Sequence, residues 1–201
     1  RIRCNSAMKF ASRKRPNMID AREYEQLARE TGAFKDIELD ILRESLLVWQ
    51  KRPGDPYTLL DLRDGRILAG FALMARAQNT EYSYDIRAFC IERAYIGKGV
   101  SQRLLELLEE EILGREGSAL IRCELSHRKE DSLGRGLFIQ AGYSLLGHIA
   151  DFYEADDDYF MYVKHIDRRA RKAADAGPGA AAEPAGSPAQ AAEGEAETGP
   201  R

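Results

Sequence analysis

A short glycine-rich segment has the residue pattern in this chain that is best suited to chemistry. The run IERAYIGKGVS over residues 91–101 joins a predicted strand to the start of the most regular predicted helix. Free N–H groups at a helix start, together with the positive end of the helix dipole, attract an anion. Gly97 and Gly99 lack a Cβ, so a phosphate can approach the main chain closely there. We therefore predict an anion site over 96–101, where Ser101 caps the helix or adds a hydroxyl contact.

The spacing of these glycines narrows the choice of anion. It matches neither the G-x-G-x-x-G pattern of dinucleotide sites nor the Walker pattern of P-loop nucleotide sites, so both are disfavoured. A plain strand-to-helix turn is the other interpretation of so short a match.

Apolar periodicity predicts the elements that must position this segment. Helical spacing indicates helices over 20–31, 36–50, 101–113 and 131–141. Alternating or continuous apolar runs indicate strands over 57–62, 66–76, 82–92, 119–125, 143–152 and 158–166. This order predicts an α/β fold with a mixed, mostly antiparallel sheet and helices on its faces.

Composition predicts one globular domain flanked by tails. The chain has 201 residues, of which 44% are hydrophobic and 31% charged. We expect a basic extension over 1–17, a folded domain over 18–166, and a disordered tail rich in Ala, Pro, Gly and Glu over 167–201. An organellar presequence is the other interpretation of the basic extension. No apolar run approaches the roughly 18 residues of a membrane-spanning helix, which predicts no membrane partner.

Charge and cysteine usage exclude further classes of protein. Residues 1–15 carry six basic groups, and residues 173–201 carry five acids against Arg201, so the total of −3 leaves −5 for the stretch between them. This sign gives no general attraction for nucleic acid, although an arm over 1–15 that binds nucleic acid is an alternative. Cys4, Cys90 and Cys123 lack the spacing of a disulfide framework or zinc site, so we expect a cytoplasmic protein without metal.

Three blocks in fixed order carry a resemblance to a known family. Residues 96–101 align with the motif Q/R-x-x-G-x-G/A, with Gly99 at its central glycine. The run DSLGRGLF over 131–138, followed by Gly142 and Tyr143, is similar to a second block, and 151–164 is similar to the closing strands. Over about residues 19–166 the chain resembles the Gcn5-related N-acetyltransferase (GNAT) superfamily, and in particular a bacterial subgroup of small acetyltransferases. It departs from the family pattern at Ile96, Ser101 and Phe138.

The resemblance implies acetyl-CoA as co-substrate, held in a V-shaped gap. The strand that ends at 90–92 would splay from the strand over 119–124, and the N–H near Ile91 would polarise the thioester carbonyl. The implied contacts to acetyl-CoA are Cys90, Ile91, Glu92, Ile96, Gly97, Lys98, Gly99, Val100, Ser101, Gln102, Asp131 and Phe138.

The resemblance also implies the catalytic groups. A protonated amine must lose a proton before it attacks, and Glu124 is the first candidate for the base and Glu92 the second, either acting through a water. Asp85 and His127 are alternatives. A covalent route through Cys90 is disfavoured, because a cysteine in a buried strand is usually inert packing.

Phe138 occupies the position of the family's usual tyrosine acid and cannot donate a proton. The CoA thiol has a pKa near that of cysteine, about 8.5, and can leave unprotonated. Tyr143 is the first candidate for a replacement donor, followed by Tyr153 and Ser132.

Two functions follow from these residues. The first is N-acetyl transfer to a primary amine of an unidentified small molecule by direct attack in a ternary complex. The second is a catalytically degenerate module that binds CoA or a partner protein. A homodimer is compatible with either function.

Overall fold

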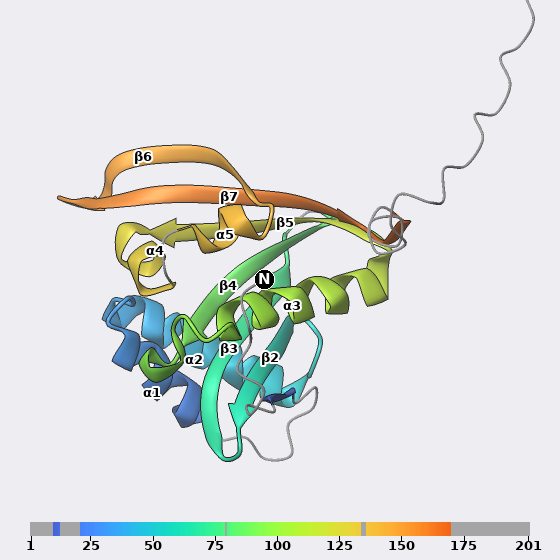
Figure 1. The fold of residues 1–201 in the computed structure, drawn as a ribbon, viewed down its shortest axis with the longest axis horizontal. Helices are drawn as coiled ribbons and strands as arrows, with labels where there is room; N and C mark the ends of the chain where they lie inside the picture. Colours follow the sequence, from blue (N-terminus) through green and yellow to red (C-terminus); the bar gives the residue numbers. More distant parts are fainter. Residues whose placement is uncertain (1–9, 13–20, 79, 134–135, 170–201) are drawn as a thin grey trace, which may run out of the picture.

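The fold is built on one seven-stranded sheet with the strand order β1-β2-β3-β4-β5-β7-β6 (Figure 1). The computed structural model describes residues 10–12, 21–78, 80–133 and 136–169, and the side chains of 10–12 and 130–132 lie outside this description. The strands are β1 (Phe10–Ser12), β2 (Tyr57–Asp64), β3 (Ile67–Arg76), β4 (Ser83–Ile91), β5 (Ser118–Ser126), β6 (Ser144–Glu154) and β7 (Asp157–Asp167). The helices are α1 (Ala21–Thr31), α2 (Asp36–Lys51), the 3₁₀ helix η1 (Arg93–Tyr95), α3 (Val100–Glu116), α4 (His127–Leu133) and α5 (Leu137–Gln140).

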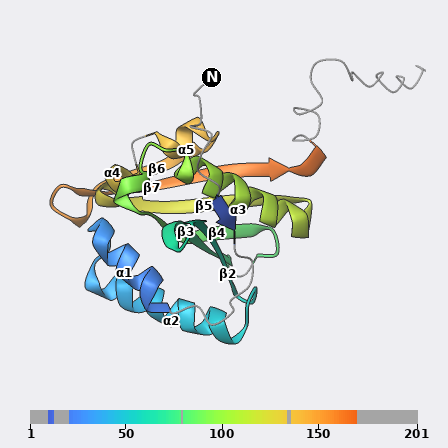
Figure 2. The ribbon, with the colours of Figure 1, turned by 60° about the horizontal axis from the view of Figure 1, so that its bottom comes forward.

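Helices cover both faces of the sheet. Figure 2 shows α1 and α2 on one side and α3 and α5 on the other. The stripe on α3 formed by Leu104, Leu105, Leu108 and Ile112 is at most 1% exposed, and it packs on the sheet with Ile121 of β5. Because the sheet is covered on both faces, β3 is buried at every residue except its two ends. The predicted α/β fold with a mixed, mostly antiparallel sheet is confirmed.

The central strands β4 and β5 form a fork. They run parallel and pair only from Ser83 with Leu120 to Ile86 with Cys123. Beyond this point β4 continues along β3 as far as Ile91, and β5 continues along β7, so the two strands no longer pair with each other. The register shifts within β3–β4 where Leu73 faces Ala88 and Met74 faces Ile86, which leaves Arg87 as an extra residue. The bulge therefore lies where the predicted fork opens.

Two predicted helices need correction. The helix expected over 101–113 begins at Val100 and runs to Glu116, and its N-cap is Gly99 rather than Ser101. The helix expected over 131–141 is instead two shorter helices, α4 and α5. Gly136, with a φ of 86°, is the N-cap of α5 in a left-handed conformation that breaks a continuous helix.

The predicted limits of the domain also change. Phe10–Ser12 forms β1 and pairs antiparallel with β2, although the segment 1–17 was expected to be a disordered extension. At the other end β7 extends to Asp167, and the N–H of Arg168 donates to the carbonyl of Gly117 at 2.9 Å. The proposed arm over 1–15 otherwise lies outside the described residues, as does the predicted tail beyond residue 169.

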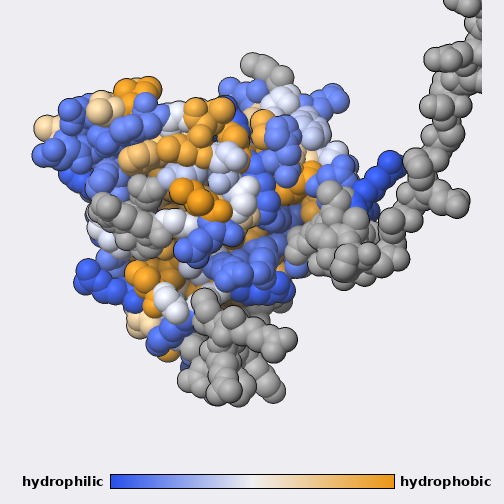
Figure 3. All heavy atoms as spheres, turned by 45° about the horizontal axis from the view of Figure 1, so that its top comes forward, coloured by the Kyte–Doolittle hydropathy of each residue, from blue (hydrophilic) through white to orange (hydrophobic). Residues whose placement is uncertain are grey.

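The edge strand β6 carries an exposed apolar surface. Its side chains of Leu145, Leu146, Ile149 and Phe152 are between 48% and 67% exposed. Figure 3 shows apolar patches among polar ones on the side of the molecule where β6 lies. The expected homodimer stays a prediction. None of the described helices has the length and apolar composition needed to cross a membrane.

Candidate active site

The predicted anion site is a turn over residues 96–102, here called the glycine arch, which leads into α3. Its residues from Ile96 to Gly99 are exposed, whereas Tyr95 and Val100 on either side are 7% and 0% exposed. The Tyr95 hydroxyl donates to the Asp64 carboxylate of β2 at 3.0 Å, which holds η1 against the sheet. The arch is therefore held in place by buried anchors while its main chain faces solvent.

Several amides of this arch are free to bind a ligand. Gly97 and Gly99 have φ of 76° and 83°, a region that favours glycine. The N–H of Lys98 donates to the Tyr95 carbonyl at 3.2 Å, but five other amides find no acceptor in the described part of the chain. These five amides belong to Gly97, Gly99, Val100, Ser101 and Gln102. They lie at the N-terminus of the 17-residue helix α3, where the dipole adds positive potential.

Side chains add little to the arch. The side-chain amide of Gln102 donates to the Glu106 carboxylate at 3.3 Å, and the Lys98 ammonium lies 5.3 Å from the centre of the Tyr95 ring. Ile96 is 44% exposed, where the family pattern has Gln or Arg. Any anion bound here is held mainly by main-chain groups.

The unpaired part of β4 offers a second set of main-chain groups. The N–H of Glu92 donates to the Ala69 carbonyl of β3 at 3.0 Å. Successive residues of a strand direct their N–H and C=O groups to opposite sides, so those of Phe89 and Ile91 face the open side of the fork. Cys90 instead directs its main chain toward β3, and its side chain packs in the cluster under α1 and α2. The predicted donor near Ile91 therefore lies on the open edge, together with that of Phe89.

Cys90 in β4 and Glu92 just after β4 do not have the surroundings expected of catalytic groups. Burial raises the pKa of the Cys90 thiol far above its ordinary value. The thiol therefore stays protonated, which disfavours a covalent route through Cys90. The Glu92 carboxylate accepts the Ala94 N–H at 2.7 Å and so caps η1. Glu92 also lies outside the lining of the cavity described next.

A cavity of about 300 Å³ lies at the opening of the fork. Its walls come from α2, β4, β5, α4 and β6, and from Phe34 before α2. Its charged lining residues are Glu38, Asp85, Arg87, Arg122, Glu124 and Lys129. The predicted base Glu124 is thus in this cavity, as is the alternative Asp85, whereas His127 is not a lining residue.

Ion pairs inside the cavity distinguish its carboxylates. Glu38 of α2 pairs with Lys129 of α4, and Asp85 of β4 pairs with Arg122 of β5 at 2.7 Å. Within the described residues Glu124 forms no ion pair, although burial and the charge of Glu124 raise the pKa of the nearby Tyr159. Tyr153 also lines the cavity, and burial, followed by the charges of Glu124 and Glu38, raises its pKa to about 12. Glu124 is therefore the cavity carboxylate best placed to accept a proton.

Comparison with known proteins agrees with this arrangement. The sequence profile described as "Acetyltransferase (GNAT) family" matches residues 21–133, which include the fork, the glycine arch and α3. The chain belongs to the GNAT family. It is accordingly an enzyme of the acyl-CoA-dependent N-acyltransferase class. No curated protein matches significantly.

Solved GNAT structures share the fold at low sequence identity. A structure described as a GNAT-family acetyltransferase from Desulfovibrio desulfuricans superposes with a TM-score of 0.66 at 23% identity, over 79% of this chain and 98% of the other. The yncA acetyltransferase from Salmonella typhimurium, solved with acetyl-CoA, gives 0.60 at 13% identity, over 80% and 95%. An aminoglycoside 6'-N-acetyltransferase complexed with coenzyme A gives 0.61 at 16% identity, over 80% and 99%.

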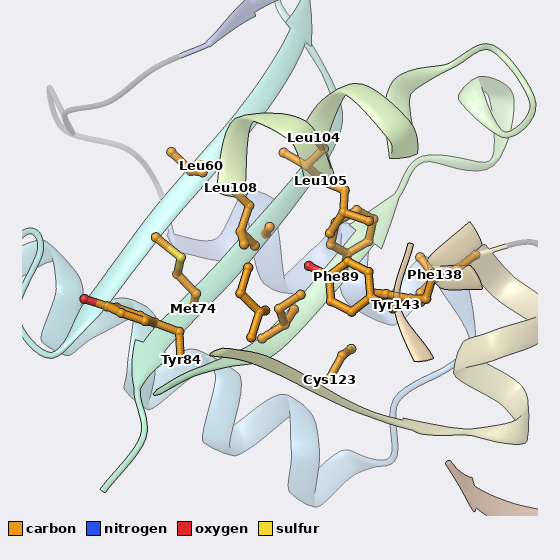
Figure 4. Close-up of a cluster of buried hydrophobic side chains, with 14 of the residues drawn as sticks. Leu60, Met74, Tyr84, Phe89, Leu104, Leu105, Leu108, Cys123, Phe138 and Tyr143 are labelled. Atoms are coloured by element: carbon orange, nitrogen blue, oxygen red, sulfur yellow. The ribbon is translucent and has the colours of Figure 1, made fainter. Parts of the chain in front are cut away.

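The position of the usual GNAT tyrosine acid is part of the core. Phe138 is 3% exposed, with its ring centre 6.1 Å from that of Phe89 on the open edge and 5.2 Å from that of Tyr143. Figure 4 shows the three rings side by side in the buried cluster. The Tyr143 hydroxyl is buried without a hydrogen-bond partner in the described structure, and its burial near Glu109 raises its pKa well above the ordinary value. Tyr143 does not line the cavity.

The remaining candidates for the proton donor are Tyr153 and Ser132. Tyr153 lines the cavity. The side chains of Asp131 and Ser132 lie outside the described residues, so their predicted roles stay predictions.

Sequence reasoning did not find four of the cavity's charged residues. These are Glu38, Arg87, Arg122 and Lys129, which come from α2, β4, β5 and α4, far apart in the chain. Each has the sequence context of an ordinary surface charge. Only the bulge at Arg87 and the break in the fork bring them to one place.

Proposed function

We propose that this GNAT enzyme transfers the acetyl group of acetyl-CoA to a primary amine of a small molecule, by direct attack in a ternary complex. The observation that carries the proposal is the alignment of three features along β4. The glycine arch follows its carboxyl end, the unpaired edge spans Arg87–Ile91, and the cavity with Glu124 lies where the fork opens. In this proposal a phosphate site and a reaction site lie at the two ends of one open strand edge.

Main-chain groups would hold the co-substrate. The free amides from Gly97 to Gln102 are suited to the diphosphate, and the edge groups of Phe89 and Ile91 are suited to pair with the pantetheine arm as an added strand does. An edge amide that donates to the thioester oxygen would stabilise the negative charge that develops during attack. Acetyl-CoA in the Salmonella structure and coenzyme A in the aminoglycoside enzyme support this assignment.

Glu124 would prepare the amine. Near neutral pH a primary amine is mostly protonated and cannot attack until it loses that proton. Glu124 borders the cavity without a cation paired to it, so its carboxylate can accept the proton directly or through a water. Glu92 remains the second candidate, although the cap it forms on η1 occupies one of its oxygens.

The leaving group needs no dedicated acid in this proposal. Phe138 supplies none, and the buried Tyr143 hydroxyl lies outside the cavity. The thiol has a pKa of about 8.5 and departs as a thiolate. A proton from Tyr143 would be the alternative.

Titration calorimetry and a thiol-release assay test the proposal together. We expect saturable binding of acetyl-CoA and of CoA, and release of free thiol only when an amine is added. If neither nucleotide binds at millimolar concentration, the proposed site is wrong. If acetyl-CoA binds but no amine among amino acids, polyamines and aminoglycosides releases thiol, the proposed small-molecule acceptor is wrong.

A further inference from the structure

The cavity at the fork contains one carboxylate and one cation that take no part in its two close ion pairs. Three carboxylates and three cations line it. The Glu38–Lys129 and Asp85–Arg122 pairs neutralise four of these charges. The two that remain are Glu124 on β5 and Arg87 on β4.

Arg87 is the cation of the cavity that makes the weakest ion pair. Within the described structure its one ion-pair contact is to Asp85 Oδ2 at 3.9 Å, and the other oxygen of Asp85 accepts from Arg122 at 2.7 Å. Its side chain is 52% exposed, whereas that of Arg122 is 35% exposed. A guanidinium held this loosely can bind an anion with two parallel hydrogen bonds.

Arg87 and Glu124 lie at different ends of the cavity. Arg122 and Glu124 lie two residues apart on the same face of β5, about 7 Å along the strand. A neighbouring hollow of about 370 Å³ shares Asp85, Arg87 and Arg122 with the cavity and adds Arg76. Arg87, Arg122 and Asp85 therefore mark the end toward this hollow, and Glu124, Tyr153 and the Glu38–Lys129 pair mark the other end.

This division determines which amine fits. An acceptor whose only charge is positive would place cationic groups against Arg87, an unfavourable contact in a partly enclosed site. An acceptor with an amine and a carboxylate a few Å apart satisfies both residues at once. A volume near 300 Å³, at the lower end of ligand pockets, suits a molecule of that size.

We propose that the acceptor is a free amino acid, whose amine meets Glu124 and whose carboxylate binds Arg87. This inference rests on the proposed acetyl transfer and specifies its substrate class. In the reaction, Glu124 takes one proton from the ammonium group, and the free amine nitrogen forms a bond to the acetyl carbon. The carbon–sulfur bond breaks, CoA leaves as a thiolate, and the second proton on the nitrogen passes to that thiolate or to solvent water. Arg87 is a binding residue that does not touch the reacting atoms.

The test compares amino acids with their own carboxamides. The full-length enzyme is assayed for thiol release with the common L-amino acids and β-alanine, with the corresponding carboxamides, and with spermidine. We expect at least one amino acid to have a kcat/KM about 10 to 100 times that of its carboxamide, as a charge-assisted hydrogen bond to the carboxylate predicts. Equal or better turnover of the carboxamides or spermidine would overturn the proposal.

Substitution of Arg87 tests whether this residue causes the preference for amino acids over carboxamides. Arg87→Gln should reduce the acid-to-amide ratio to about 1 by weakening the acid alone. Arg29→Gln on α1 is the matched control, because Arg29 is 55% exposed and outside the cavity, and it should keep the ratio of the wild type. An equal loss for acid and amide in Arg87→Gln would contradict a carboxylate-binding role, and thermal melting would show that both variants are folded.

The same assay separates this proposal from the one on which it rests. Thiol release with carboxamides or polyamines alone would leave acetyl transfer standing and overturn the amino-acid acceptor. No thiol release with any amine, although acetyl-CoA binds, would overturn the small-molecule acceptor and this inference with it.

Discussion

The glycine arch and the cavity lie at opposite ends of the open stretch of β4, and they are suited to binding by different means. The arch offers five free amides, and its side chains make few contacts. The cavity is lined by charged side chains from four helices and strands, and most of them are paired across the fork. A main-chain site depends on backbone conformation, whereas a side-chain site depends on which charges meet. The two should therefore respond to different substitutions and affect different kinetic constants.

Loss of the proposed base should give the largest effect. Glu124→Gln is expected to lower kcat about 100-fold near pH 7, the usual range for removal of a general base. The deficit should grow as pH falls, because less of the amine is then unprotonated. Acetyl-CoA affinity, measured by calorimetry, should stay within about twofold of the wild type, since the cofactor arch is untouched.

Glu92→Gln is the matched control for this prediction. Its carboxylate caps η1 and lies outside the cavity. We expect it to change kcat by less than about threefold, and a drop equal to that of Glu124→Gln would assign the base to Glu92 instead.

A substitution in the arch should affect affinity instead of the chemical step. Gly99→Val places a branched side chain at a φ of 83°, strains the turn and obstructs the approach of a phosphate. We expect acetyl-CoA to bind at least about 10-fold more weakly by calorimetry, the loss of one or two charge-assisted hydrogen bonds.

Gly65→Val separates strain from ligand contact. Gly65 also has a positive φ, 61°, but it lies in the turn between β2 and β3. This variant should lose comparable thermal stability and keep its acetyl-CoA affinity. Equal weakening of binding in both variants would mean that the arch does not contact the ligand.

The smallest effect on turnover is expected at the buried Tyr143, which lies in the core and does not line the cavity. Tyr143→Phe removes a hydroxyl that has no hydrogen-bond partner in the described structure. It should raise the melting temperature by about 2–4 °C, because the cost of an unsatisfied polar group disappears. Turnover in the thiol-release assay should remain within about twofold of the wild type. A loss of 10-fold or more would identify Tyr143 as the general acid, a role that Phe138 cannot fill.

The contrast between the two regions also explains how far the sequence could predict them. The positions of Gly97 and Gly99 before a regular helix locate the arch, because main-chain conformation is encoded locally. The apolar periodicity around it predicted the helices, the strands and the fold class, and the resemblance to the GNAT superfamily implied the fork. Glu124 is a candidate from the sequence because it lies at the carboxyl end of a predicted strand, and Asp85 is one only if the register of its strand directs it into the pocket.

Long-range contacts set the limit of this reasoning. The pairing of Glu38 with Lys129 joins residues 91 positions apart, and no spacing rule indicates it. The availability of Arg87 depends on a bulge, which shifts the direction of its side chain without any Gly or Pro signal at that position. The break between α4 and α5 was missed for a different reason, because the glycines at 134 and 136 were present and were read as part of a helix.

Amide exchange measured by NMR, with and without CoA, tests the central claim most directly. We predict that the amides of Phe89, Ile91, Gly97 and Val100–Gln102 become protected when CoA binds. The amides of the paired stretch from Ser83 to Ile86 should keep their exchange rates. Saturating CoA that leaves Phe89, Ile91 and the arch unprotected would contradict main-chain binding along the open edge of β4.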